Sequence, residues 1–283
     1  LRMKPDFALA HNTMGNVFFD LKNMDKAVKH YRKALSTRPD FDNAHYNLAN
    51  ALVANGQVEL GIEHFRKALD LNPNYAAAHN NLGKALLDLG NTRAAIDHLS
   101  SAVDLDPESA QTHFNLATAL RSTGRMKDAI NHFFAALRID PNYIKSHNNL
   151  GNALKSEGRL DEAIAHYREA LHLAPQSAAA HINLANALLQ QDKTEEALDY
   201  FLQALQIDPE LPEAHYNLGN LLARMDRNTE AIDHYRKAVR LRPDYTKAHN
   251  NLGILLVSVG KRKEGTNHLK RALALKNNIP TQD

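Results

Sequence analysis

Histidine has the widest chemical range of the residues in this chain, which contains 16 of them. A neutral imidazole binds metals and transfers protons near physiological pH. Fifteen histidines form two series, each with a spacing of 34 residues or a multiple of it. The first series is His11, His45, His79, His113, His147, His181, His215 and His249, and the second is His30, His64, His98, His132, His166, His234 and His268. A catalytic histidine is normally unique and oriented by a partner. We therefore expect packing and hydrogen bonding, with a metal ladder or pH sensing as the alternatives.

Asparagine forms a second pair of series that favours binding rather than catalysis. Seven asparagines follow one another at the same spacing, and four more lie three residues after members of that series. The candidate peptide-binding residues are Asn47, Asn81, Asn115, Asn149, Asn183, Asn217 and Asn251, together with Asn50, Asn152, Asn186 and Asn220. A carboxamide both donates and accepts, so it pairs with a peptide backbone whatever the peptide's side chains. The alternative is hydrogen bonding to neighbouring helices or to water.

Other chemistry has little support in the sequence. The chain lacks cysteine, which excludes disulfides, thiolate metal sites and cysteine nucleophiles. It has no glycine-rich phosphate loop, HExxH metal motif or nucleophile elbow. We expect no catalytic residues, no metal ligands and no cofactor. The net charge of +2 does not favour nucleic acid, and no apolar stretch is long enough to cross a membrane.

The spacing reflects an internal repeat, which the prolines mark. Eight of them lie 34 residues apart: Pro5, Pro39, Pro73, Pro107, Pro141, Pro175, Pro209 and Pro243. With position 1 at Ala8, the chain divides without insertions into repeats 8–41, 42–75, 76–109, 110–143, 144–177, 178–211, 212–245 and 246–279. The histidines then occupy positions 4 and 23, and the asparagines positions 6 and 9.

Each repeat predicts two helices separated by a turn. Apolar or small residues at positions 4, 7, 8 and 11 form one face of a first helix, as in His45, Leu48, Ala49 and Leu52. Glycine is frequent at position 15, where it ends a helix at little cost. A second helix then has small residues at positions 20 and 27, which permit close packing, and the proline at position 32 stops it. The chain is therefore expected to be all-α.

These positions resemble the tetratricopeptide repeat: N-L-G/A-x-x-L at positions 6 to 11, small residues at 8, 20 and 27, an aromatic residue at 24 and proline at 32. The resemblance covers essentially the whole chain. It implies a right-handed α-α superhelix, a solenoid of eight helix-turn-helix repeats whose first helices line a concave groove. The asparagine series with AHYNLA and SHNNLG is also similar to the repeat region of O-linked N-acetylglucosamine transferases and to related bacterial repeat proteins. That likeness implies asparagines that bind the backbone of extended protein substrates.

We expect a non-catalytic scaffold that binds proteins or extended peptides, without nucleic acid or membrane contact. Residues 1–7 match the tail of a preceding repeat and 280–283 form a short tail, so we expect an excised fragment. Because a solenoid needs covered ends, more chain or end-to-end self-association would cover them. The alternatives are the substrate-recognition arm of a larger glycosyltransferase and a self-assembling repeat module. The lack of cysteine is compatible with a cytoplasmic location, which we expect.

Overall fold

The computed structural model describes residues 5–277, in which the chain forms sixteen α-helices and no strands. It divides into two compact units, and the boundary along the chain lies between Ser146 and His147, within α9. The first unit contains α1 (Pro5–Asp20), α2 (Met24–Thr37), α3 (Asp42–Ala54), α4 (Val58–Leu71), α5 (Ala76–Asp88), α6 (Thr92–Leu105), α7 (Ala110–Ser122) and α8 (Met126–Ile139). The second contains most of α9 (Ile144–Ser156), then α10 (Leu160–Leu173), α11 (Ala178–Leu189), α12 (Thr194–Ile207), α13 (Pro212–Arg224), α14 (Asn228–Leu241), α15 (Thr246–Ser258) and α16 (Arg262–Lys276).

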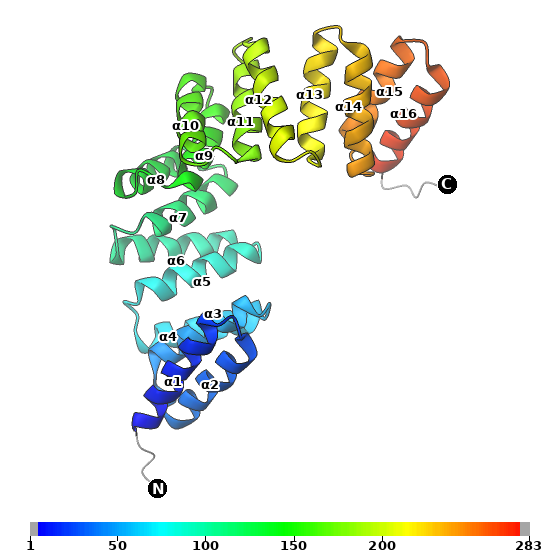
Figure 1. Ribbon diagram of the computed structural model, residues 1–283. Helices are drawn as coiled ribbons and strands as arrows, with labels where there is room; N and C mark the ends of the chain where they lie inside the picture. Colours follow the sequence, from blue (N-terminus) through cyan, green and yellow to red (C-terminus); the bar gives the residue numbers. More distant parts are fainter. Residues whose placement is uncertain (1–4, 278–283) are drawn as a thin grey trace. The chain divides into compact units, whose positions relative to one another are not determined.

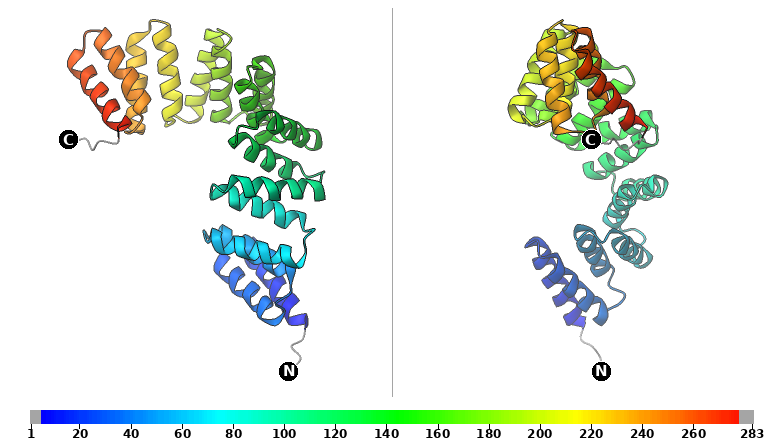
Figure 2. Two further views of the ribbon diagram at one scale, coloured as in Figure 1. Left: turned by 180° about the vertical axis from the view of Figure 1, so that it is seen from behind. Right: turned by 90° about the vertical axis from the view of Figure 1, so that its right-hand side faces the viewer.

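Within each unit, consecutive helices pack as antiparallel pairs and each pair stacks on the next (Figures 1 and 2). From the second repeat on, the first helices begin at position 1 of the sequence register, at Asp42 in α3 and Thr246 in α15, for example. Helix α1 begins earlier, at Pro5, a favourable first residue because proline has no N–H to leave unpaired. The expectations for residues 1–4 and 280–283 lie outside the described residues. The predicted all-helical solenoid of two-helix repeats is confirmed.

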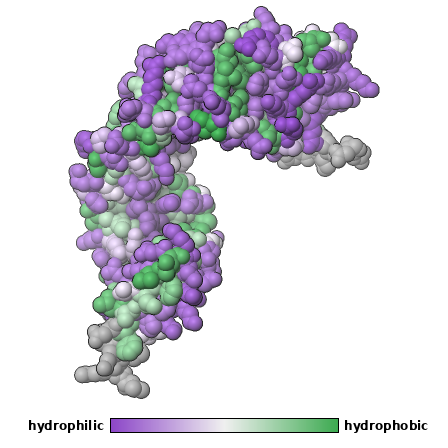
Figure 3. Space-filling model, viewed as in Figure 1, coloured by the Kyte–Doolittle hydropathy of each residue, from purple (hydrophilic) through white to green (hydrophobic). Residues whose placement is uncertain are grey.

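The buried core of each pair follows from the small and apolar positions of the repeat. Leu48 and Leu52 of α3 are fully buried, and they face Ala27 and Tyr31 of α2 in one cluster. The alanine at position 27 is 0% exposed in seven repeats and 6% exposed at Ala272, so no larger side chain fits there without moving a helix. Figure 3 shows that the face in view is mostly hydrophilic between scattered apolar patches.

Two glycine positions carry different constraints. Gly56 ends its first helix with φ +77°, a conformation that favours glycine, and its surroundings are open. Gly151 lies inside α9, where an added Cβ would be 2.6 Å from a ring carbon of Tyr167. The turn position holds a non-glycine residue at Lys22, Asp192 and Asp226, with φ between 56° and 58°, and these residues bear the strain that glycine avoids.

Candidate peptide-binding face

The predicted asparagines all lie on first helices. We call the surface that these side chains occupy within each unit the first-helix face of that unit. They belong to α3 (Asn47, Asn50), α5 (Asn81), α7 (Asn115), α9 (Asn149, Asn152), α11 (Asn183, Asn186), α13 (Asn217, Asn220) and α15 (Asn251). Asn115 is buried, with 8% of its surface exposed, and the others are half-buried. A half-buried carboxamide needs hydrogen-bond partners, so the partners of each asparagine determine what it has left for a ligand.

Two position-6 asparagines reach back to an asparagine at position 5 of the preceding repeat. Asn47 Nδ2 donates to Asn12 Oδ1 at 3.1 Å, and Asn115 Nδ2 donates to Asn80 Oδ1 at 2.9 Å. The Asn115 oxygen also accepts from Gln111 at 2.9 Å. These side chains therefore connect adjacent repeats, which is the internal role that the sequence left open as the alternative.

Asn81 shows a second pattern, in which position 5 of the preceding repeat holds a tyrosine. Its Nδ2 donates to the Tyr46 hydroxyl at 3.1 Å and to Asn50 Oδ1 at 2.8 Å. In the second unit, Asn251 makes the same two bonds, to the Tyr216 hydroxyl at 3.3 Å and to Asn220 Oδ1 at 2.8 Å. The side-chain amides of Asn81 and Asn251 thus have hydrogen-bond acceptors within the chain.

Position 9 has a further partner inside its own repeat, the tyrosine at position 24. The hydroxyl donates to the asparagine Oδ1 in Tyr31–Asn16 at 2.8 Å, Tyr167–Asn152 at 2.7 Å and Tyr235–Asn220 at 2.7 Å. Burial raises the pKa of the Tyr235 hydroxyl to about 12, so the hydroxyl keeps its proton and remains a donor. These asparagines fix the second helix against the first.

Repeat 6 and its neighbour depart from both patterns. Among residues 5–277, Asn183, Asn186 and Asn217 are the predicted asparagines whose side chains make no hydrogen bond. Two local substitutions account for two of them. Phe201 stands at position 24 and has no hydroxyl for Asn186, and Ile182 stands at position 5 and offers Asn217 no polar atom. The donors and acceptors of these three carboxamides on α11 and α13 are therefore not used in internal hydrogen bonds.

A hollow of about 510 Å³ lies beside one of these carboxamides, Asn183, between α11 and the start of α13. In repeats 2, 4 and 7 the aromatic residue at position 5 packs on the tyrosine that precedes the next first helix. The ring centroids are 4.8 Å apart for Tyr46–Tyr75, 5.2 Å for Phe114–Tyr143 and 5.0 Å for Tyr216–Tyr245. In repeat 6 the corresponding residues are Ile182 and Leu211, which are smaller and leave space. Asn183, Asp208 and Glu213 give the hollow its polar edge, and Glu213 is paired with Arg242.

The sequence indicated this site only indirectly. We predicted every asparagine of the series alike, without the apolar hollow that distinguishes Asn183. The usable signal was Ile182, which is the one aliphatic residue in a position-5 series that otherwise consists of asparagine and aromatic residues.

The histidines meet inside each repeat, with position 4 of the first helix bonded to position 23 of the second. In the described part of the chain, seven repeats have an Nδ1···Nδ1 distance of 2.9–3.1 Å. In the pair formed by His45 and His64, His45 Nε2 also lies 2.9 Å from the Pro39 carbonyl. A carbonyl only accepts, so His45 carries its proton on Nε2 and its Nδ1 accepts from His64 Nδ1–H.

This geometry gives the histidines a structural role and places a proton between the two rings. The expectation of hydrogen bonding is confirmed by these pairs. No group of three or more histidine, aspartate or glutamate side chains within residues 5–277 is arranged to hold a metal ion. No helix among those residues combines the length and the apolar character needed to cross a bilayer.

Comparison with protein families and known structures places these features in context. A family profile described as the C-terminal domain of cilia and flagella-associated protein 70 matches residues 7–210, and a tetratricopeptide repeat profile matches residues 212–245. No curated protein matches the chain.

Solved structures share the fold. A chain of PilF from Pseudomonas aeruginosa has 27% identity and a TM-score of 0.63, with 73% of this chain and 93% of that chain covered. YrrB, described as a tetratricopeptide repeat protein with an unusual peptide-binding site, has 24% identity and a TM-score of 0.57, covering 65% of this chain and 95% of its own. A chain of the APC/C hetero-tetramer Cut9–Hcn1 has 16% identity and a TM-score of 0.67, with 90% and 50% covered.

Proposed function

Because the chain belongs to the tetratricopeptide repeat family, whose repeats mediate protein–protein interactions, we propose that its first-helix face binds an extended polypeptide without catalysis. The observation that carries this proposal is the coincidence of three carboxamides without hydrogen bonds and an apolar hollow in repeats 6 and 7. The other predicted asparagines have internal partners, or in the case of Asn149 an interaction of its own.

The chemistry of this region fits a peptide segment. Asn183, Asn186 and Asn217 each offer donors and an acceptor, which match the N–H and C=O groups of an extended backbone. Ile182 and Leu211 supply an apolar surface for one side chain of that peptide. Asp208 and Glu213 at the edge disfavour an acidic side chain at this point, so we propose an apolar residue flanked by uncharged or basic ones.

The remaining asparagines contribute less in this proposal. Asn81 already donates to two acceptors, and Asn50 and Asn220 already accept from neighbours. A ligand reaching these side chains would have to share or replace an existing bond. Replacing a bond gains little, because a net hydrogen bond contributes only about 1 kcal/mol.

The test compares two triple variants of the full chain for binding to an array of extended, sequence-diverse peptides. Asn183→Ala/Asn186→Ala/Asn217→Ala removes the three side chains that have no internal bond. We expect unchanged helicity and unfolding temperature, with peptide binding at least about tenfold weaker, which corresponds to about 1.4 kcal/mol.

The matched control is Asn47→Ala/Asn81→Ala/Asn115→Ala, which removes side chains that connect repeats in the first unit. We expect this variant to lose stability and to keep most of its peptide binding. Equal binding by the parent and the repeat 6–7 variant would contradict the proposal and make the asparagines structural.

Three sequence-based expectations remain proposals beside this one. They are membership of a larger glycosyltransferase as its substrate-recognition arm, a cytoplasmic location and self-association of the terminal helices. For self-association, apolar side chains do lie exposed at the end pairs: Phe7 of α1 is 62% exposed and Leu273 of α16 is 59% exposed.

A further inference from the structure

Repeat 6 contains the one histidine at position 4 whose histidine partner is missing from the sequence. Position 23 of this repeat is Tyr200, whereas the seven other repeats have histidine there. His181 keeps its other bond, with Nε2 2.9 Å from the Pro175 carbonyl. The carbonyl only accepts, so His181 carries its proton on Nε2, and Nδ1 presents a lone pair.

That lone pair is buried and unsatisfied. His181 is 6% exposed, and within the described residues its Nδ1 has no hydrogen-bond partner. Since the bond to Pro175 orients the ring as in the paired repeats, Nδ1 points toward position 23. The Tyr200 ring lies there, with its centroid 5.7 Å from that of His181 and its plane tilted by 36°. It presents ring carbons where the other repeats present an N–H, so the acceptor is covered and left without a donor.

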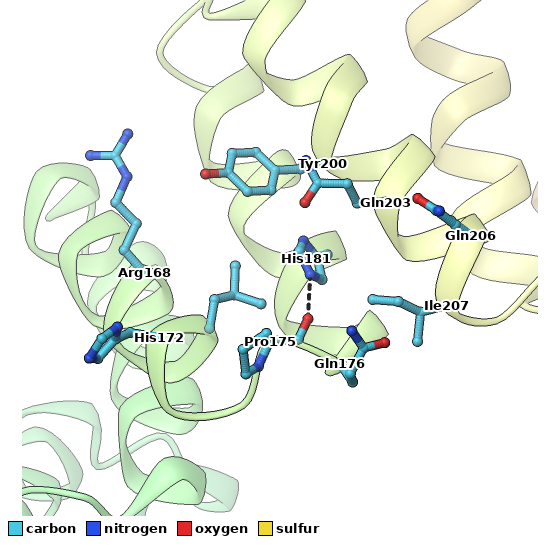
Figure 4. A pocket seen from close by; sticks show the side chains of 10 residues that line it. Arg168, His172, Pro175, Gln176, His181, Tyr200, Gln203, Gln206 and Ile207 are labelled. Atoms are coloured by element: carbon cyan, nitrogen blue, oxygen red, sulfur yellow. Dashed lines mark hydrogen bonds between the residues drawn. The ribbon is translucent and has the colours of Figure 1, made fainter.

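A pocket of about 620 Å³ adjoins this pair on the surface formed by the second helices (Figure 4). Arg168, Leu171 and His172 line it from α10, Gln203, Gln206 and Ile207 from α12, and Pro175, Gln176, His181 and Tyr200 complete it. In Figure 4, the Tyr200 ring stands over His181 at one side of the open space. Displacement of this one side chain would therefore connect the acceptor with the pocket.

The rim of the pocket is polar with little net charge. Arg168 is paired with Glu196 at 2.8 Å, so its charge is already balanced. Gln176, Gln203 and Gln206 are exposed carboxamides that each both donate and accept. Such a rim does not attract a strongly charged ligand, and it does not offset the free energy that a charged ligand loses when it leaves water. An uncharged polypeptide segment therefore suits it better.

We propose that this pocket is a second binding site, in which an uncharged segment of a partner protein inserts a histidine side chain and donates its imidazole N–H to His181 Nδ1. Tyr200 moves aside into the pocket, and the glutamines bind the main chain of the inserted segment. The choice of imidazole rests on the molecule itself. In the five paired repeats where Nε2 also faces a proline carbonyl, the equivalent nitrogen accepts an imidazole N–H at 2.9–3.0 Å.

The site is independent of the proposed peptide-binding face. It lies on the surface of the second helices α10 and α12, with the turn at Pro175 and His181 at its base, whereas the other site lies on the first-helix face around Asn183. Failure of one proposal therefore leaves the other in place.

The experiment uses the full chain with nitrogen-15-labelled histidine, at a pH where added imidazole is neutral. Imidazole is the probe, and 1-methylimidazole is its matched control, because the methyl group replaces the N–H donor. We expect imidazole to shift the His181 Nδ1 resonance, with binding at least about tenfold tighter than for 1-methylimidazole. A short uncharged peptide with one histidine should shift the same resonance, and the same peptide with phenylalanine should not.

Two variants complete the test. Tyr200→His supplies the missing internal donor and should abolish the imidazole effect while preserving helicity. His64→Tyr recreates the arrangement of repeat 6 in repeat 2 and should leave an imidazole-responsive nitrogen on His45. No shift at His181 with imidazole, an equal shift with 1-methylimidazole, or persistence of the shift in Tyr200→His would overturn the proposal.

Discussion

Acidification is expected to destabilise this chain, because the histidine pairs allow only one proton between their two facing nitrogens. Burial, aided by the nearby charges, lowers the pKa of His64 from 6.5 to about 4, and it lowers that of His234 to about 4 as well. Folding depresses the pKa values of these two rings, so their contribution to stability is complete above about pH 6.5. It declines as the pH falls from about 6.5 toward 4.

The magnitude follows from the pKa change. At about pH 5, one ring whose pKa falls from 6.5 to about 4 on folding contributes about 2 kcal/mol less than at neutral pH. We halve this to about 1 kcal/mol per ring, because each ring is partly in contact with solvent. Two such rings give about 2 kcal/mol, a substantial part of the 5–15 kcal/mol typical of folded proteins.

The charged groups around the two pairs shift the histidine pKa values in both directions. Lys67 and Arg32 lower the pKa of His64, and Asp42 raises that of His45. Lys237 lowers the pKa of His234, whereas Asp233 and Glu230 raise it. Desolvation outweighs all of them in both second-helix rings, so the direction of the prediction does not depend on the carboxylates.

The assay is urea unfolding followed by far-ultraviolet circular dichroism, at about pH 7.5 and about pH 5. The matched variant is His64→Tyr/His234→Tyr, which copies the natural pair of His181 with Tyr200. We expect this variant to be less stable than the parent near neutrality, where it lacks two hydrogen bonds. Its loss on acidification should be smaller by about 2 kcal/mol. The same loss in parent and variant would refute the reasoning.

Three further predictions concern the fold. Gly151→Ala should lower the stability of the chain by about 1–3 kcal/mol in thermal unfolding, because the new Cβ would clash with the Tyr167 ring. This cost should exceed the gain from the higher helix propensity of alanine, and a stabilised variant would contradict the packing. Asp192→Gly should raise the unfolding free energy by about 0.5–1 kcal/mol by relieving the positive φ, whereas Gly56→Asp should lower it. Leu48→Asp should cost more than about 4 kcal/mol and melt neighbouring repeats, since it buries an unpaired charge; unchanged melting would show the register to be wrong.

Much of the fold was predictable because its signals are local and repeated. Spacing alone predicted that Leu48 and Ala34 would be buried, and glycine predicted the turn at Gly56. Asp192 and Lys22 take the same turn conformation without glycine, because the packing of the flanking helices determines the chain direction there.

The candidate site was predictable only in part. The asparagine series was visible, but the partners of each carboxamide depend on residues a full repeat away. Asn81 donates to Tyr46 and Asn50 of the preceding repeat. Asn217 has Ile182 in the place of Tyr46 and makes no such bond. Only the stacking of the repeats shows which side chains share a bond and which keep their hydrogen-bonding capacity.

The peculiarities of repeat 6 have a consequence for the dynamics of the chain. Among the described residues, this repeat lacks the histidine–histidine bond, its Asn186 accepts no tyrosine hydroxyl, and its neighbour's Asn217 does not reach back to it. In a linear array, cooperativity passes only between neighbours, so the least connected repeat limits how far order propagates. Native-state opening should begin at α11 and α12, whose amides would exchange with solvent faster than those of the repeats on either side. The segment with the most hydrogen-bonding capacity to spare would then also be the one that rearranges around a ligand at the smallest energetic cost.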